Sequence, residues 1–154
     1  MATTREDDPV TTRPIEKTVE IPVPREEAFE RFTADMAAWW PLATHSVGRS
    51  RTETVVFEEK EGGRIYERQK DGGEEVWGTV EVWEPHERLR FTWHPGERED
   101  SAQTVEVRFE EGDEGTRVQL THDGWDRLGE RAPAAREEYD SGWEPVLGRY
   151  KTLI

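Results

Sequence analysis

The stretch that decides the fold is residues 76–95, VWGTVEVWEPHERLRFTWHP. In its second half Leu89, Phe91 and Trp93 alternate with polar residues. A period of two is typical of a strand that buries one face. The first half is a longer run of β-branched and aromatic residues that ends at a Glu-Pro turn. The stretch therefore predicts two antiparallel strands joined by a tight turn.

Similar runs continue on both sides of this pair, separated by turns rich in Gly and Asp. The predicted strands cover residues 15–23, 54–58, 64–68, 76–83, 88–93, 105–110 and 117–122. The last six follow one another through tight turns, so we expect an antiparallel meander.

Helical patterns flank the strands. Residues 24–32 begin at Pro24 and place apolar residues at helical spacing, and residues 35–40 and 125–128 predict two further short helices. Near the C-terminus the apolar positions follow one face of a long helix. They are Tyr139, Trp143, Val146, Leu147, Tyr150, Leu153 and Ile154. Because Gly142, Pro145 and Gly148 are poor helix formers, we expect the middle of this helix to be irregular or bent.

The order of elements predicts an α+β fold in which a curved antiparallel sheet of about seven strands wraps around the C-terminal helix. Residues 14–154 form one domain of this kind, and residues 1–13 are expected to be a disordered lead-in. A curved sheet that grips a single helix tends to leave a cavity between them, and such cavities bind small molecules.

Composition narrows the possible functions. The chain has 154 residues, with 35 Asp and Glu against 21 Lys and Arg, and its formal net charge is −14. This charge disfavours nucleic acid and anionic membranes as partners. There is no Cys, no apolar run long enough for membrane insertion, and no signal-peptide pattern, so we expect a cytoplasmic protein. Seven Trp, five Phe and three Tyr concentrate the apolar content in large rings.

Several motifs, taken in order, resemble one known superfamily. They are residues 19–24, 27–29, 39–42, 62–67, 77–80, 83–85, 88–93, 115–118, 122–125 and 142–143. The chain resembles the helix-grip (SRPBCC or START-like) superfamily, and within it the branch named for the C-terminal domain of the activator of the Hsp90 ATPase. The resemblance implies the helix-grip fold. For function it implies a range that includes lipid carriers, cyclases and chaperone activators.

Two histidines and two glutamates are candidates for chemistry. His45 and His122 could project toward the cavity as general acids or bases, or could be hydrogen-bonded structural residues. His86 and His94 are expected to be exposed. Glu67 and Glu81 lie in the middle of strands, and we expect both on the solvated face, since an inward carboxylate would be rare and would have a raised pKa.

The aromatic residues have two interpretations that the sequence leaves open. They either line a pocket or fill the core of a chain that is otherwise poor in apolar residues. Strand parity does not decide whether Trp77 faces inward. The predicted ligand-binding residues are Trp39, Trp40, Trp77, Phe91, Trp93, His122, Trp125, Tyr139 and Trp143.

The preferred hypothesis is that a small hydrophobic or aromatic molecule binds between the sheet and the C-terminal helix. One alternative is a cyclase or hydrolase that uses a cavity histidine, and another is an interaction protein with a chaperone partner. No metal-ligand spacing and no cofactor motif is present, so neither a metal nor a cofactor is expected. The oligomeric state is left open.

Overall fold

The computed structural model describes residues 13–152. The predicted lead-in, apart from Arg13, lies outside these residues, as do Leu153 and Ile154 of the predicted helix face. The described strands are β1 (Ile15–Ile21), β2 (Thr52–Phe57), β3 (Arg64–Gln69), β4 (Glu74–Glu84), β5 (Arg88–Trp93), β6 (Gln103–Glu111) and β7 (Thr116–Asp123). They form one antiparallel sheet in the order β1-β7-β6-β5-β4-β3-β2. The predicted meander is confirmed, and β1 extends it beside β7.

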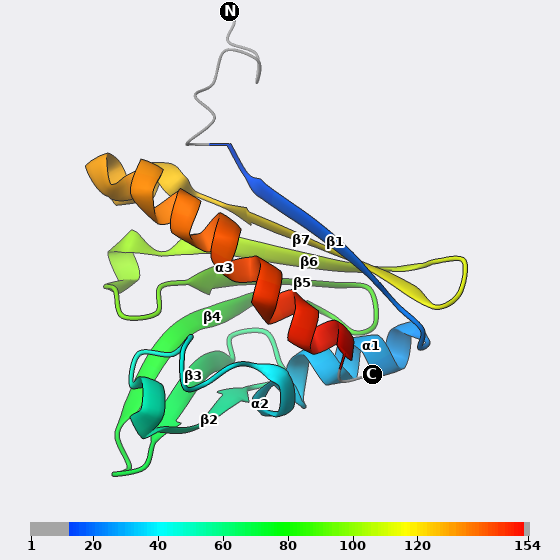
Figure 1. Cartoon of the computed structure of the whole chain (residues 1–154), viewed down its shortest axis with the longest axis horizontal. Helices are drawn as coiled ribbons and strands as arrows, with labels where there is room; N and C mark the ends of the chain where they lie inside the picture. Colours follow the sequence, from blue (N-terminus) through cyan, green and yellow to red (C-terminus); the bar gives the residue numbers. More distant parts are fainter. Residues whose placement is uncertain (1–12, 153–154) are drawn as a thin grey trace, which may run out of the picture.

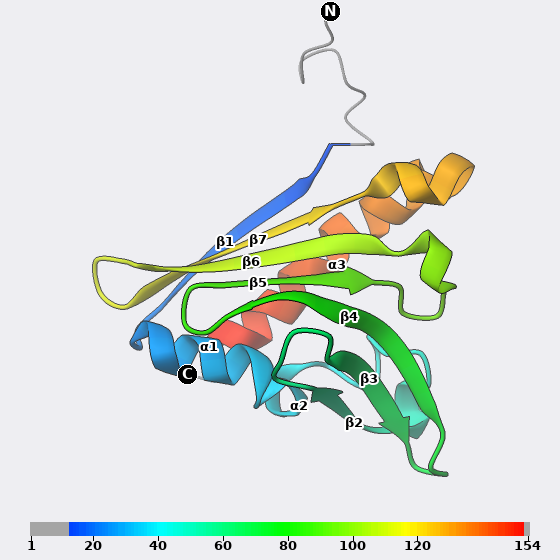
Figure 2. The ribbon, with the colours of Figure 1, turned by 180° about the vertical axis from the view of Figure 1, so that it is seen from behind.

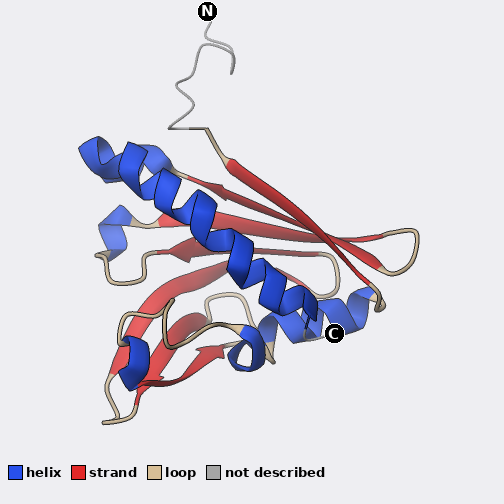
Figure 3. Cartoon of the chain, in the orientation of Figure 1, coloured by secondary structure: helices blue, strands red, loops and turns tan. Residues whose placement is uncertain are grey.

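The helices gather on one face of the curved sheet, as Figures 1 and 3 show, and Figure 2 presents the opposite face. The α-helices are α1 (Arg25–Thr33), α2 (Met36–Trp39) and α3 (Ala132–Thr152). Three short 3₁₀ helices accompany them: η3 (Arg49–Arg51), η4 (Glu99–Ser101) and η5 (Trp125–Arg131). The α+β helix-grip prediction is therefore confirmed.

Helix α3 runs without interruption through Pro145, so the prediction of an irregular middle is wrong. Pro145 and Gly148 both lie on the exposed side of the helix. The hydrogen bond that Pro145 cannot donate is therefore lost on the solvent side. Trp143, Val146 and Leu147 are buried on the opposite side and hold the helix against the sheet.

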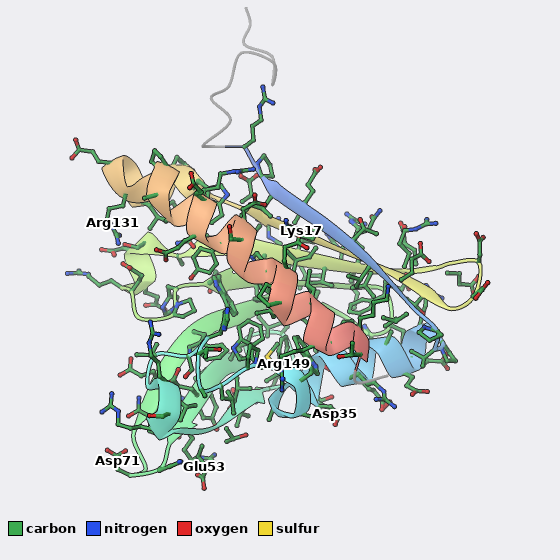
Figure 4. The ribbon with its side chains drawn as sticks, in the orientation of Figure 1. Lys17, Asp35, Glu53, Asp71, Arg131 and Arg149 are labelled. Carbon is green, nitrogen blue, oxygen red and sulfur yellow. The ribbon has the colours of Figure 1, made fainter. Side chains whose placement is uncertain are left out.

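Polar contacts fix α3 across the sheet at several points. The Tyr150 hydroxyl donates to the Ala28 carbonyl in α1 at 2.7 Å. The Arg149 guanidinium donates to the carbonyl of Trp39, in α2, at 2.7 Å, and Lys17 in β1 pairs with Asp140 and Glu144 of α3. Figure 4 labels Lys17 and Arg149. The helix is thus bonded both to the edge strand and to the two short helices.

Strand β4 resolves the ambiguity over the tryptophan faces. Its pairing slips once against β3 and once against β5, so a strict period of two does not hold along it. Trp77 and Val80 are buried, and Trp83 packs inward against Phe29 of α1 with ring centroids 5.0 Å apart. The inward positions of this strand therefore recur every three residues, as β-bulges allow.

Aromatic rings from several elements pack together between the sheet and α3. Trp40, at the end of α2, contacts the rings of Trp77, Trp93 and Trp143 at 5.2, 5.7 and 5.9 Å between centroids. These rings join the tryptophans of the short helices, the sheet and α3 into one cluster. The tryptophans thus supply much of the core, and the remaining open space lies at its border.

Candidate functional site

An open cleft of about 420 Å³ lies between α3, the loop that follows α2, and the loop that follows β5. Its volume falls in the range of small-molecule sites. Its aromatic and aliphatic lining consists of Trp40, Val47, Trp93, Pro95, Gly96, Tyr139, Gly142, Trp143 and Val146. Its polar lining consists of Thr44, His45, Ser46, Arg49 and Glu138.

The structure brings four of the predicted ligand-binding residues together at this cleft: Trp40, Trp93, Tyr139 and Trp143. The other predicted residues lie outside its lining. Trp39 packs on Tyr150 with ring centroids 5.0 Å apart, and Phe91 packs on Phe57 at 5.7 Å. Trp77 is fully buried, and His122 stacks on Trp125 at 4.3 Å.

His122 lies outside the cleft lining and bonds to Trp143, which lines the cleft. It is fully buried, and its Nδ1 accepts a hydrogen bond from the Trp143 indole at 3.0 Å. Gln103 donates its amide N–H to the Ser101 carbonyl, which leaves its oxygen facing His122 Nε2 at 3.3 Å. His122 is therefore the Nε2–H tautomer. Burial lowers the pKa of His122 to about 3, so its imidazole is neutral and orients Trp143.

His45 has a different position, on the cleft itself. It is half-buried, its Nδ1 lies 2.8 Å from the Thr44 hydroxyl, and its carbonyl accepts the Trp40 indole N–H at 2.8 Å. Among the residues described, none forms a hydrogen bond with its Nε2. His45 and Glu138 both line the cleft, the first from the loop and the second from α3.

The loop that carries His45 is fixed by a buried carboxylate that we expected on the solvated face. Glu67 is fully buried in β3, and that prediction is wrong, whereas Glu81 is exposed as predicted. The Glu67 carboxylate accepts five hydrogen bonds. The donors are Val47 N and Gly48 N, each at 2.7 Å, Trp77 Nε1 at 2.8 Å, Thr52 Oγ1 at 3.1 Å and Gln69 Nε2 at 3.2 Å.

Glu67 stays an ionised carboxylate despite its burial. Desolvation alone would raise its pKa, but the hydrogen bonds outweigh this effect and the pKa is lowered. Glu67 thus ties Val47 and Gly48 of the cleft loop to β3 and to Trp77 in the core. No residue pattern indicated this role, because the bonded partners come together only when the loop folds back onto the sheet.

The prediction that His94 is exposed is also wrong. Its backbone N–H donates to the Trp77 carbonyl at 2.6 Å, so the chain stays beside β4 for one residue after β5 ends. His94 is 6% exposed, and neither ring nitrogen bonds to any other residue that the structure describes. His86 is half-buried and packs edge-on against Phe29, with ring centroids 5.6 Å apart.

Among the six buried tryptophans of the described residues, one differs from the others in its indole N–H. Five of the indole N–H groups donate to protein acceptors, and these belong to Trp39, Trp40, Trp77, Trp125 and Trp143. The Trp93 N–H is buried and has no hydrogen-bond partner within residues 13–152. It lies beside the Tyr139 hydroxyl at the cleft.

Within residues 13–152, no three His, Asp or Glu side chains are grouped so that they could hold a metal ion. None of the helices in residues 13–152 has the length and apolar character needed to cross a membrane.

The comparisons with known structures agree with this fold. The chain is 32% identical to Txn09, described as an anthrahydroquino-γ-pyrone synthase and solved in complex with a molecule designated SUM. The match covers 92% of this chain and 97% of that one, with a TM-score of 0.65. MLL2253 from Mesorhizobium loti is 17% identical over 92% of this chain and 96% of its own, with a TM-score of 0.65. DynU16, from the dynemicin biosynthetic locus, is 20% identical over 90% of this chain and 46% of its own, with a TM-score of 0.66.

No curated protein matches the chain. The family model described as activator of Hsp90 ATPase homolog 1-like protein matches residues 22–154. This match spans the sheet, the short helices and α3, and it agrees with the helix-grip topology. The chain therefore belongs to the family of activator of Hsp90 ATPase homolog 1-like proteins, within the helix-grip superfamily.

Proposed function

We propose that the cleft binds a planar aromatic small molecule. The observation that carries this proposal is the lining, in which Trp40, Trp93, Tyr139 and Trp143 converge on one open space from the residue after α2, from β5 and from α3. Flat ring faces offer a large contact area to a planar ligand at little cost in side-chain entropy. The polar rim formed by the loop and by Glu138 would set its orientation.

The similarity to Txn09 supports a ligand with several fused rings. The description of that protein calls it an anthrahydroquino-γ-pyrone synthase, and the two chains are 32% identical over nearly their whole lengths. We extend to this chain only the ligand class. The expected ligand is therefore a fused-ring aromatic compound.

Isothermal titration calorimetry with anthracene-2-sulfonate, a soluble three-ring probe, tests the proposal. Gly142 lines the cleft from α3, and a Cβ built on it meets nothing within 4 Å. Gly142→Leu should therefore fill the cleft without disturbing the fold. Gly148→Leu is the matched control, because Gly148 is on the same helix, outside the lining, with equally open space.

We expect Gly142→Leu to weaken binding by at least about tenfold and Gly148→Leu to bind as the wild type does. Thermal unfolding checks that both variants are folded. An absence of binding to the wild type, or equal affinities for the two variants, would contradict the proposal.

A second candidate function is cyclase-type catalysis, and the position of His45 favours it. His45 lies on the cleft with its Nε2 unbonded to other described residues, so this nitrogen could exchange a proton with a bound ligand. In that case His45→Gln should abolish turnover of an aromatic polyketide substrate while leaving its Kd within about threefold. Unchanged turnover in this variant would exclude the role.

The family description also motivates a chaperone partner. The test is the ATPase rate of Hsp90 with increasing amounts of the protein. A rate that stays constant up to a molar excess would count against this hypothesis.

A further inference from the structure

The buried N–H of Trp93 is a polar group that the fold leaves without a partner. A buried indole N–H normally finds an acceptor, because an unpaired one loses its hydrogen bond to water without replacement. In this chain the other fully buried tryptophans follow that rule, and Trp93 is the exception among the described residues. Trp93 also lines the cleft. Because the Trp93 nitrogen is itself buried, a ligand does not reach it directly, and its acceptor has to be a polar group beside it at the border of the cleft.

The Tyr139 hydroxyl lies beside this N–H, and Tyr139 also lines the cleft. The Trp93 N–H is close enough to the Tyr139 hydroxyl to lower the pKa of Tyr139. The two groups nevertheless do not have the geometry of a hydrogen bond in this structure. Within residues 13–152 the Tyr139 hydroxyl forms no other hydrogen bond. If the hydroxyl oxygen accepts from Trp93, its proton is free to donate to a group in the cleft.

The charges around Tyr139 select the kind of acceptor. Burial raises the pKa of Tyr139 to about 12, and the carboxylates of Glu97 and Glu138 act in the same direction, so the hydroxyl keeps its proton. These carboxylates also disfavour an anionic oxygen at the same position. The cationic and titratable groups of the lining, Arg49 and His45, come from the loop rather than from α3. A neutral carbonyl oxygen is the acceptor that fits beside Tyr139.

We infer that Trp93 and Tyr139 form an oxygen-recognition pair, and that the ligand is an aromatic carbonyl compound of the quinone type. This inference rests on the proposed function. The aromatic walls would hold the rings, and the Tyr139 O–H would donate to a ring carbonyl while accepting from the Trp93 N–H. A hydrogen-bonded chain of this kind strengthens each of its members.

The test compares two probes of the same charge and ring number, anthraquinone-2-sulfonate and anthracene-2-sulfonate, by calorimetry. The first probe carries carbonyl oxygens and the second does not. We expect the wild type to bind the quinone at least about tenfold more tightly, which is the effect of one gained hydrogen bond. Tyr139→Phe should remove this preference, so that both probes bind with about equal affinity. Its affinity for the anthracene probe should stay within about twofold of the wild-type value.

Tyr66→Phe is the matched control, since Tyr66 lies in β3, outside the cleft lining. We expect this variant to keep the wild-type preference. A second variant replaces Trp93 by benzothienylalanine, which keeps the bicyclic shape but lacks the N–H. It should also reduce the preference, and it provides an independent test if Tyr139→Phe lowers stability.

The outcomes separate the two proposals. If neither probe binds, the proposed function fails. If both probes bind the wild type equally, aromatic binding stands and the recognition pair is wrong. A preference that persists in Tyr139→Phe, or that disappears in Tyr66→Phe, would also overturn the pair.

Discussion

At the scale of single residues, Glu67 combines a buried charge with a complete set of donors. Glu67→Gln keeps the size of the side chain but turns one acceptor oxygen into an amide donor. Either amide orientation then faces at least two of the five donors with another donor. We expect a loss of about 2–4 kcal/mol in the free energy of unfolding at neutral pH, measured by urea denaturation.

The matched control for this substitution is Glu81→Gln. Glu81 pairs with Arg90 at the surface, where both side chains are nearly half exposed. Such an ion pair contributes little, so the change should stay within about 0.5 kcal/mol. Equal effects at both positions would mean that the buried hydrogen bonds of Glu67 do not stabilise the fold.

Acid should reduce the contribution of Glu67. Its pKa in the folded state is lowered, so its stabilisation is complete above the unfolded-state pKa of about 4.3 and is lost as the pH falls toward the folded-state value. The difference in unfolding free energy between wild type and Glu67→Gln should therefore narrow between pH 7 and pH 3. A constant difference over this range would contradict the lowered pKa.

The buried His122 should give the free energy of unfolding a second dependence on pH, at a higher pH than that of Glu67. Its pKa is about 3 in the folded state against 6.5 unfolded, so its contribution is present above pH 6.5 and declines as the pH falls. Relative to His122→Gln, the wild type should lose about 1.5 kcal/mol between pH 6.5 and pH 5. Urea denaturation measures this loss. Imidazole ¹⁵N shifts should show the neutral Nε2–H tautomer at pH 5, and a titration near pH 6.5 would refute the assignment.

At the scale of elements, the sequence periodicity predicted the strands and their order well, and it failed where backbone contacts change the period. Leu89, Phe91 and Trp93 alternate as expected because β5 pairs regularly with β6. In β4 the bulges change which residues face inward, because the register of pairing shifts against β3 and against β5. No residue type in the sequence indicates where such a shift occurs. The 3₁₀ helices η3 and η4 were missed, since a single turn of helix leaves no periodic pattern.

Gly78 marks the close approach of β4 to β5. A Cβ at this position would lie 1.7 Å from the Thr92 carbonyl oxygen, which is part of the backbone and cannot move aside. Gly78→Ala should destabilise the protein by about 3 kcal/mol or more. Gly148→Ala, on the exposed side of α3 with open space around it, should stabilise the protein by about 0.5–1 kcal/mol. Thermal unfolding of both variants checks this, and equal effects would contradict the close approach.

At the scale of the whole molecule, four of the nine predicted ligand-binding residues line the cleft, and the other five pack outside its lining. Trp40 and Trp143 both fill the core and line the cleft, so the two interpretations of the tryptophans describe opposite sides of the same rings. The position of the cleft depends on the loop that Glu67 ties to β3, and on the loop after His94. Those contacts join residues far apart in the chain, which local patterns cannot reveal.

The net charge of −14 leads to the last prediction, because most of the ion pairs that accompany it lie at the surface. Exposed pairs stabilise little, while the excess of carboxylates repels itself in the compact state. Raising the ionic strength from about 0.01 M to about 0.15 M shortens the screening length from about 30 Å to about 8 Å. We expect the Tm to rise by about 2–5 °C over this range in sodium chloride, as followed by circular dichroism.

A triple variant with Glu53, Glu61 and Glu114 changed to Lys removes exposed negative charge, so its Tm should rise less with salt. A Tm that falls with salt would mean that the surface ion pairs outweigh the repulsion between the carboxylates.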